Sequence, residues 1–111
     1  MSTAPRVSRE AMAIYRATAQ RRWGEEQQKS ARRRERAWQI ARHAAVLLKE
    51  QFGATRVVAF GSLVHGHWFS SASDIDLAAW GVKTDDYFVA VAKLQDLSPE
   101  FQVVLFHLLL P

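Results

Sequence analysis

Two aspartates, Asp74 and Asp76, stand two residues apart in an apolar segment that ends at Trp80. Side chains alternate between the two faces of a β-strand, so this spacing places both carboxylates on one face. Neighbouring carboxylates repel each other, and burying them unpaired is costly, so the pair favours a site for a divalent cation. Mg²⁺ prefers hard oxygen ligands and commonly shares its coordination shell with water and substrate phosphates. We therefore expect the aspartates to bind Mg²⁺ beside a phosphate group.

A glycine and a serine, Gly61 and Ser62, follow the apolar run from Val57 to Phe60. Such a run predicts a buried strand, and the glycine marks the point at which the strand ends and the backbone turns. Ligands of open α/β sheets bind at strand ends of this kind. Backbone N–H groups at the turn and the Ser62 hydroxyl are suited to holding phosphate oxygens. We expect the turn to hold the phosphate chain whose metal ion the aspartates bind.

The two motifs together resemble the signature of the DNA polymerase beta-like nucleotidyltransferase superfamily. Eleven residues separate Gly61-Ser62 from Asp74-Ile75-Asp76. Within the superfamily, the sequence Phe60-Gly-Ser-Leu-Val-His-Gly66 is similar to that of the minimal nucleotidyltransferases. The resemblance covers residues 50 to 106. It implies a nucleotidyltransferase fold, one or two Mg²⁺ ions, and ATP or another NTP as substrate. Its site residues would be Asp74 and Asp76 for catalysis and metal binding, and Gly61, Ser62, Gly66 and Ser73 for nucleotide binding.

The chain departs from this family at the last strand, where members usually carry a third aspartate. The segment from Phe101 to His107 contains no acid, and Val104 aligns with the family's aspartate. Glu100 is expected to precede the strand, and His107 is better explained as a packed side chain than as a base. The chain then ends at Pro111, where family members continue with polar residues, so one interpretation is a truncated or frame-shifted C-terminus.

The family resemblance implies transfer of NMP to a hydroxyl, with a tyrosine of a HEPN ribonuclease as one acceptor and an antitoxin role for the chain. The loss of the third acid favours nucleotide binding over turnover. The alternative is a non-catalytic nucleotide-binding or partner-binding protein that acts through its helical arm. A third hypothesis is nucleic-acid binding through the arginine cluster from Arg32 to Arg36, because phosphate neutralisation requires such a basic surface.

The elements that must position these residues form an α/β (α+β) fold, a small mixed sheet of about three strands with helices on one face. Glycine, proline and the apolar pattern mark the element boundaries. A helix is expected to begin at Thr84 as N-cap and to bury Phe88 with other apolar residues. The expected strands are Thr55–Phe60, Asp74–Trp80 and Phe101–Leu110, with a short helix over Ser62–Gly66.

A single long helix is expected over residues 8 to 51, since no proline interrupts it and Gly24 is its one weak point. Its second part carries an apolar stripe that would pack on the sheet. The first part has a thinner stripe, so it is expected to project as a basic arm, residues 1–36, from a nucleotidyltransferase domain, residues 37–111. The arm is expected to pair with a HEPN-type partner or with another copy of the chain. The two stripes are Trp38, Ala41, Ala45, Leu48, Phe52 and Met12, Tyr15, Ala19, Trp23.

Charge is divided unevenly along the 111 residues. Residues 1–50 contain twelve Lys and Arg against five Asp and Glu, whereas residues 51–111 contain three against six. The chain has no cysteine, which suits a reducing compartment. Its N-terminus lacks the apolar region of a signal peptide, and no apolar run approaches the roughly 20 residues that span a bilayer. We expect a cytoplasmic protein without a membrane segment.

Overall fold

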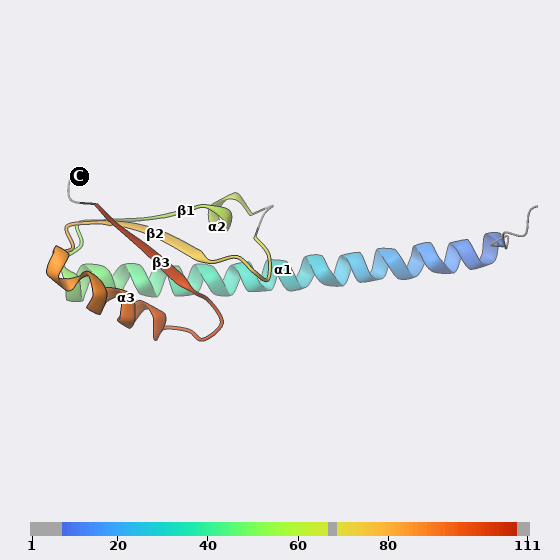
Figure 1. Cartoon of the computed structure of the whole chain (residues 1–111). Coiled ribbons are helices and arrows are strands. Elements are labelled where there is room, and N and C mark those ends of the chain that lie inside the picture. The colour runs from blue at the N-terminus through green and yellow to red at the C-terminus, as the bar shows by residue number, and fades with distance from the viewer. Residues whose placement is uncertain (1–7, 67–68, 109–111) are drawn as a thin grey trace, which may run out of the picture.

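The computed structural model describes residues 8–66 and 69–108 of the chain. It is a mixed α+β fold in which a long N-terminal helix precedes a small mixed sheet, as the sequence predicts (Figure 1). Two helices, α1 and α3, lie together on one face of the sheet (Figure 1). The elements are α1 (Arg9–Phe52), β1 (Arg56–Phe60), α2 (Ser62–His65), β2 (Ile75–Trp80), the 3-10 turn η1 (Thr84–Asp86), α3 (Tyr87–Gln95) and β3 (Val103–Leu108).

Helix α1 is continuous over 44 residues and passes through Gly24 without a break. The Ser8 hydroxyl accepts a hydrogen bond from the Ala11 N–H at 3.1 Å, which satisfies one of the donors that a helix start leaves unpaired. Gly53 ends the helix in the left-handed conformation, at φ 69°, and its N–H donates to the Leu48 carbonyl. The predicted bounds of this helix are confirmed to within one residue.

The sheet has the order β1-β2-β3, with β1 antiparallel and β3 parallel to the central strand β2. Parallel neighbours require a crossover, and η1 with α3 supplies it. Alternate residues of β2 are buried under the helices, beginning with Ile75 and Leu77. Asp76 therefore lies on the opposite, open face of the central strand.

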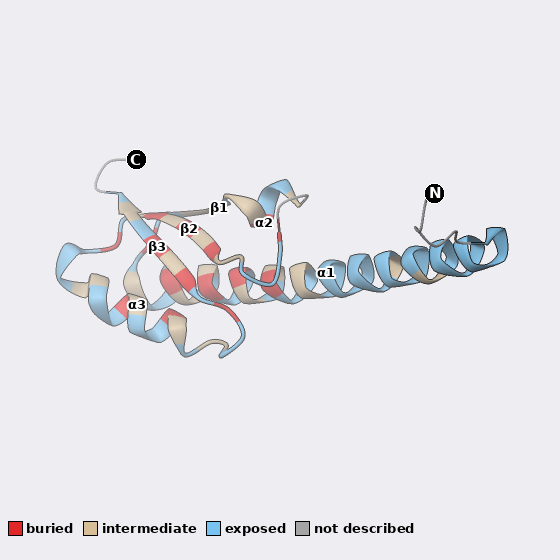
Figure 2. Ribbon diagram, turned by 45° about the vertical axis from the view of Figure 1, so that its right-hand side comes forward, coloured by how far each residue is buried: buried red, intermediate tan, exposed pale blue. Residues whose placement is uncertain are grey.

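The hydrophobic core lies between this sheet and the helices α1 and α3 (Figure 2). Small residues on α1 allow the helix to approach the sheet closely, and Leu48 fills the remaining space. Burial of these side chains provides the main stabilisation of the fold. The buried residues are Ala37, Ala41, Ala44, Leu48, Ala54, Leu63, Phe69, Ile75, Leu77, Ala79, Val82, Ala90, Leu94, Phe101, Val103 and Leu105.

Helix α3 differs from the expectation at its start. The cap position of η1 belongs to Lys83 and carries no side-chain cap hydrogen bond, so Thr84 is not the predicted cap. The helix that follows this 3-10 turn buries Ala90 and Leu94. Phe88 lies on the other side and is 80% exposed, so its predicted burial is wrong.

Side chains of α3 also cover the outer edge of β3. The Tyr87 hydroxyl donates to the Leu105 carbonyl at 2.7 Å. The Gln95 amide donates to the Val103 carbonyl and accepts from the Val103 N–H. Exposed strand edges invite pairing with other chains, and these contacts satisfy part of the edge.

The N-terminal half of α1 extends away from this domain as a free helix (Figure 1). Residues 9–32 are exposed, apart from partial burial of Thr18 and Gly24. The radius of gyration is 21.4 Å, against about 13 Å for a compact domain of this length. Within the described residues, no helix combines the length and apolarity needed to cross a bilayer.

Candidate functional site

The acids predicted to bind metal lie at one end of the central strand. Asp76 is paired in register with Phe60 of β1 on one side and with Val104 of β3 on the other. Asp74 immediately precedes β2, whose first residue, Ile75, donates its N–H to the Gln102 carbonyl at 2.9 Å. Both aspartates are partly buried. The strand thus presents them away from the helices, on the open face of the sheet.

Burial and a neighbouring charge both act on Asp76. Partial burial raises the pKa of Asp76, and the negative charge of Asp74 raises it further. Both causes oppose ionisation, so a cation beside the pair would relieve them. In the part of the chain that the structure describes, no three His, Cys, Asp or Glu residues form a metal-binding group. Two carboxylates leave most of the coordination shell of a hard cation to water or phosphate, and metal binding by this pair stays a prediction.

The glycine turn lies directly against this pair. Gly61 has φ 75° and ψ −150°, a conformation that is essentially restricted to glycine. A Cβ built on Gly61 would stand 2.5 Å from the Asp76 carboxylate oxygen Oδ2. The residues Val64 and His65 both donate their N–H groups to the Gly61 carbonyl at 3.2 Å, which starts α2 beside the acids. The structure thus brings the predicted phosphate turn and the predicted metal ligand Asp76 together.

Arg34 of α1 fixes the far end of this turn. Its Nε donates to the Leu63 carbonyl at 2.9 Å, and its Nη2 donates to the Val64 carbonyl at 3.2 Å. A cation is favourable at carbonyls that end a helix. Gly66 has φ 54°, and a Cβ there would stand 3.2 Å from the Arg34 guanidinium carbon. Gly66 therefore makes room for Arg34, while Ser62 occupies the first position of α2.

Ser73 belongs to the loop that leads into Asp74. Its hydroxyl accepts a hydrogen bond from the Ser70 N–H at 2.8 Å, and the Ser70 hydroxyl accepts from the Ala72 N–H at 3.2 Å. These bonds close a tight turn before the acids. Nucleotide binding by Ser73 stays a prediction.

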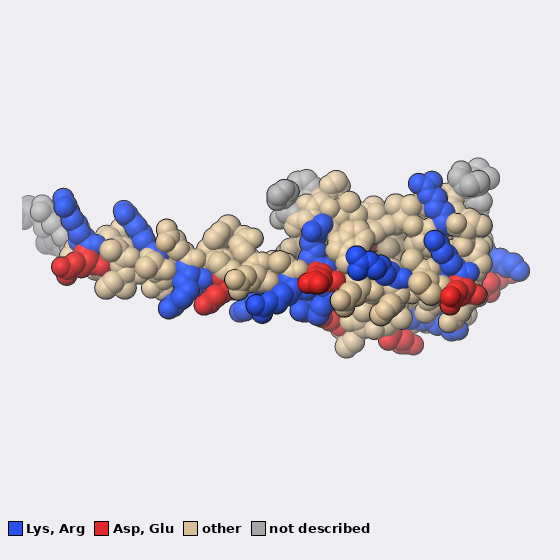
Figure 3. Space-filling model, turned by 180° about the vertical axis from the view of Figure 1, so that it is seen from behind, with Lys and Arg blue, Asp and Glu red and all other residues tan. Residues whose placement is uncertain are grey.

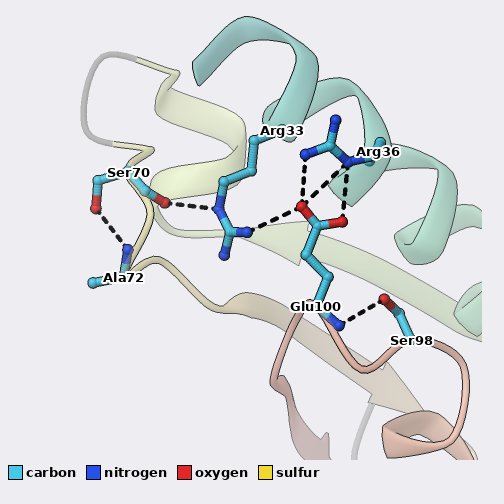
Figure 4. Close-up of polar contacts among 6 residues, drawn as sticks. All are labelled: Arg33, Arg36, Ser70, Ala72, Ser98 and Glu100. Carbon is cyan, nitrogen blue, oxygen red and sulfur yellow. Dashed lines mark hydrogen bonds and ion pairs between the residues drawn. The ribbon is translucent and has the colours of Figure 1, made fainter. Parts of the chain in front are cut away.

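The arginine cluster mostly contacts its own domain. Arg33 donates to the Ser70 carbonyl and to Glu100, each at 3.2 Å (Figure 4). Arg36 forms an ion pair with Glu100 at 2.6 Å. The Arg33 guanidinium also lies 4.3 Å from the centre of the Phe101 ring, a cation–π contact. Arg33 and Arg36 thus hold the loops that precede β2 and β3, Arg34 holds α2, and Arg32 remains exposed.

An aromatic pair extends the open face beside the acids. Phe60 and Phe106 meet edge to face with ring centres 5.3 Å apart, and they are 37% and 50% exposed. Alternation along β3 places Val104 and Phe106 on the open face and His107 on the helix side. His107 packs against the Tyr87 ring at 5.0 Å, so it does not face Asp76.

Sequence reasoning missed Arg33, Arg34 and Phe106 as parts of this region. The sequence does contain a signal for Arg33. It lies four residues before Ala37, which lies four residues before Ala41, so all three residues share the buried face of α1. Phe106 stands two residues after Val104 on the same strand face. Comparison of the chain with protein-family models, curated proteins and solved structures gives no match.

Proposed function

We propose that the chain binds a magnesium-complexed nucleoside triphosphate, with ATP as the first choice, and transfers NMP from it to a hydroxyl group. The observation that carries this proposal is the contact between Gly61 and the Asp76 carboxylate. It sets a turn suited to phosphate oxygens beside a pair of acids suited to Mg²⁺. The motif resemblance to minimal nucleotidyltransferases supports the same reading.

The roles of the residues follow from their positions. Asp74 and Asp76 would hold the metal, and the backbone of Gly61 and Ser62 would orient the phosphate chain. Bound Mg²⁺ supplies neutralisation of phosphate charge and polarisation of the phosphorus under attack. The chief contribution of the chain is to orient the phosphate chain, because in-line attack of the hydroxyl on the phosphorus depends on the positions of the reacting atoms more than on covalent chemistry by the protein. The open sheet face around Phe60 and Phe106 offers an apolar surface for the rest of the nucleotide.

The acceptor is proposed from the family resemblance alone. A tyrosine of a HEPN-type protein encoded beside this chain would receive the NMP, which gives the chain an antitoxin role. The two partners would meet at the open sheet face, where Asp76 lies.

Calorimetric titration with ATP tests the site. We expect binding in the presence of Mg²⁺ and a loss of at least about tenfold in affinity for Asp74→Asn and Asp76→Asn, about 1.4 kcal/mol. Asp85→Asn is the matched control, because Asp85 is an exposed aspartate of η1 away from the pair. Equal affinity in all four proteins, or binding that ignores Mg²⁺, would contradict the proposed site.

A second candidate function is nucleotide binding without turnover. It is favoured by Val104, which occupies the β3 position paired with Asp76 and offers neither a metal ligand nor a proton acceptor. ATP labelled on its α-phosphate distinguishes the two functions. Label transfer by the wild type that Asp76→Asn abolishes supports the enzyme. Binding without transfer, and gain of transfer in Val104→Asp, supports a binding protein descended from an enzyme.

A further inference from the structure

An apolar stripe remains exposed on the free half of α1. Tyr15 and Trp23 are 71% and 69% exposed, and Met12 is 37% exposed. With Ala19, these residues recur at steps of three and four and form one helix face, which we call the arm stripe (Met12, Tyr15, Ala19, Trp23). Ala19 precedes the fully buried Ala37 by eighteen residues, which is five turns of 3.6 residues. The arm stripe therefore continues the face that α1 packs on its own sheet.

We propose that the arm stripe packs against the arm stripe of a second copy of this chain, as an antiparallel helix pair centred near Ala17. In this register Tyr15 lies opposite Ala19 of the second copy, and Met12 lies within one residue of the position opposite Trp23. The inference is independent of the proposed nucleotide site, because the arm stripe is on the free half of α1 whereas the acids are at the start of β2 (Figure 1).

The sizes of the side chains fit this register. Each large ring then meets a smaller or more flexible side chain, as close packing requires: Tyr15 meets alanine, and Trp23 meets methionine. A surface hollow runs along one side of the arm stripe, and a side chain of the second copy can enter it. The hollow is lined by Ala11, Ile14, Tyr15, Thr18, Ala19 and Arg22.

The charges select the antiparallel orientation and a second copy as the occupant. Residues 9–22 contain four arginines and the single acid Glu10, whereas Glu25 and Glu26 follow the arm stripe. Glu26 lies on the same helix face as the arm stripe, and an antiparallel pair brings it beside Arg9 and the positive N-terminal end of the other helix. A parallel pair would align each arginine with the same arginine of the other copy, which repels. Charged side chains of both signs are spread along the arm (Figure 3).

The geometry leaves room for both domains. Helix α1 reaches from Ala17 to Arg9 over about 12 Å, and from Ala17 to Arg33, which hydrogen-bonds to the loop before β2, over about 24 Å. Arg33 of each copy thus lies about 12 Å beyond Arg9 of the other copy. The pair can form along the whole arm stripe before the domains meet.

Two alanines provide a matched test by sedimentation equilibrium. Ala17 and Ala19 are both exposed, and their separation of 200° puts them on opposite faces of the helix. We expect the wild type and Ala17→Glu to have twice the 12.6 kDa mass of the chain and Ala19→Glu to have the mass of one chain. Circular dichroism should show equal helix content in all three. A wild type of single-chain mass, or equal masses for the two variants, overturns the proposal.

Cysteine cross-linking tests the orientation, since the chain has no cysteine of its own. A mixture of the Tyr15→Cys and Ala19→Cys chains should form a mixed disulfide under mild oxidation. Each variant alone should form little covalent dimer, because identical positions are offset along an antiparallel pair. Ready self-cross-linking of each variant, without preference for the mixed disulfide, would show a parallel pair and overturn the register.

Discussion

Gly61 shows how one missing side chain can shape the candidate site. Its backbone conformation and its approach to Asp76 both exclude a Cβ. The sequence predicts a glycine turn after a strand, because the apolar run ends there. It does not predict that this glycine touches Asp76, because the register of β1 against β2, which pairs Phe60 with Asp76, is set by tertiary packing.

Alanine at two glycines should change stability in opposite directions. Gly61→Ala should lower the free energy of unfolding by more than about 1 kcal/mol, because it strains the backbone and crowds the Asp76 carboxylate. Gly24→Ala should raise it by up to about 1 kcal/mol, because Gly24 is inside α1 and a Cβ there meets nothing within 4 Å. Urea unfolding measures both. An unchanged free energy of unfolding in Gly61→Ala would mean that the turn does not press on the Asp76 carboxylate.

Helix α1 shows at the scale of elements what sequence patterns can and cannot reveal. Its length and caps follow from local signals, namely Ser8, Gly53 and the absence of proline. The contacts of Arg33 and Arg36 with Glu100 join residues more than sixty positions apart. Charge composition alone favours a solvent-facing or nucleic-acid-binding cluster, because a pattern along one helix does not identify its partners elsewhere in the chain.

The link between α1 and the loop before β3 should depend on pH. The hydrogen bond from Arg36, with the charges of Arg36 and Arg33, holds the pKa of Glu100 below its ordinary 4.5. A carboxyl with a lowered folded-state pKa stabilises the fold above the ordinary value and loses that effect as the pH falls toward the folded-state value. Glu100→Gln should therefore lower the thermal midpoint modestly at pH 7, and the difference should shrink below pH 4.5.

Exposed Glu50 of α1 is the control for this measurement. Glu50→Gln should leave the midpoint nearly unchanged at both pH values, because surface charges away from specific contacts contribute little. A Glu100→Gln difference that stays constant from pH 7 to below 4.5 would show that the carboxylate charge is not what joins the helix to the loop.

The whole molecule consists of a small packed domain and a helix that extends far beyond it, 74 Å in the longest dimension against 26 and 22 Å. The sequence predicts this shape from the thin apolar stripe and high charge of the arm. The buried residues of α1 begin at Ala37, so the exposed helix before Arg33 is not needed to fill the core.

Removal of the arm separates folding from association. A chain that begins at Ala31 should remain folded, because Arg33 and all buried residues are retained. Its thermal midpoint should not vary with protein concentration, whereas that of the full chain should rise with concentration if two copies associate. Calorimetry over a range of concentrations measures both. Unfolding of the short chain would show that the arm supports the domain directly.

Arg33 and Arg36 join α1 to the loop before β3, so a long free segment of the helix extends from one point of attachment. The segment from Arg9 to Arg32 is about 36 Å long. It extends from the place where the guanidinium groups of Arg33 and Arg36 contact the Glu100 carboxylate (Figure 4). Over this length, a tilt of about 5° at the Glu100 contact would displace the N-terminal end of the helix by about 3 Å. A tilt of α1 that followed a small movement of the loops flanking the acids would therefore be largest at the distant end, where it would change the fit of the arm stripe to a second copy.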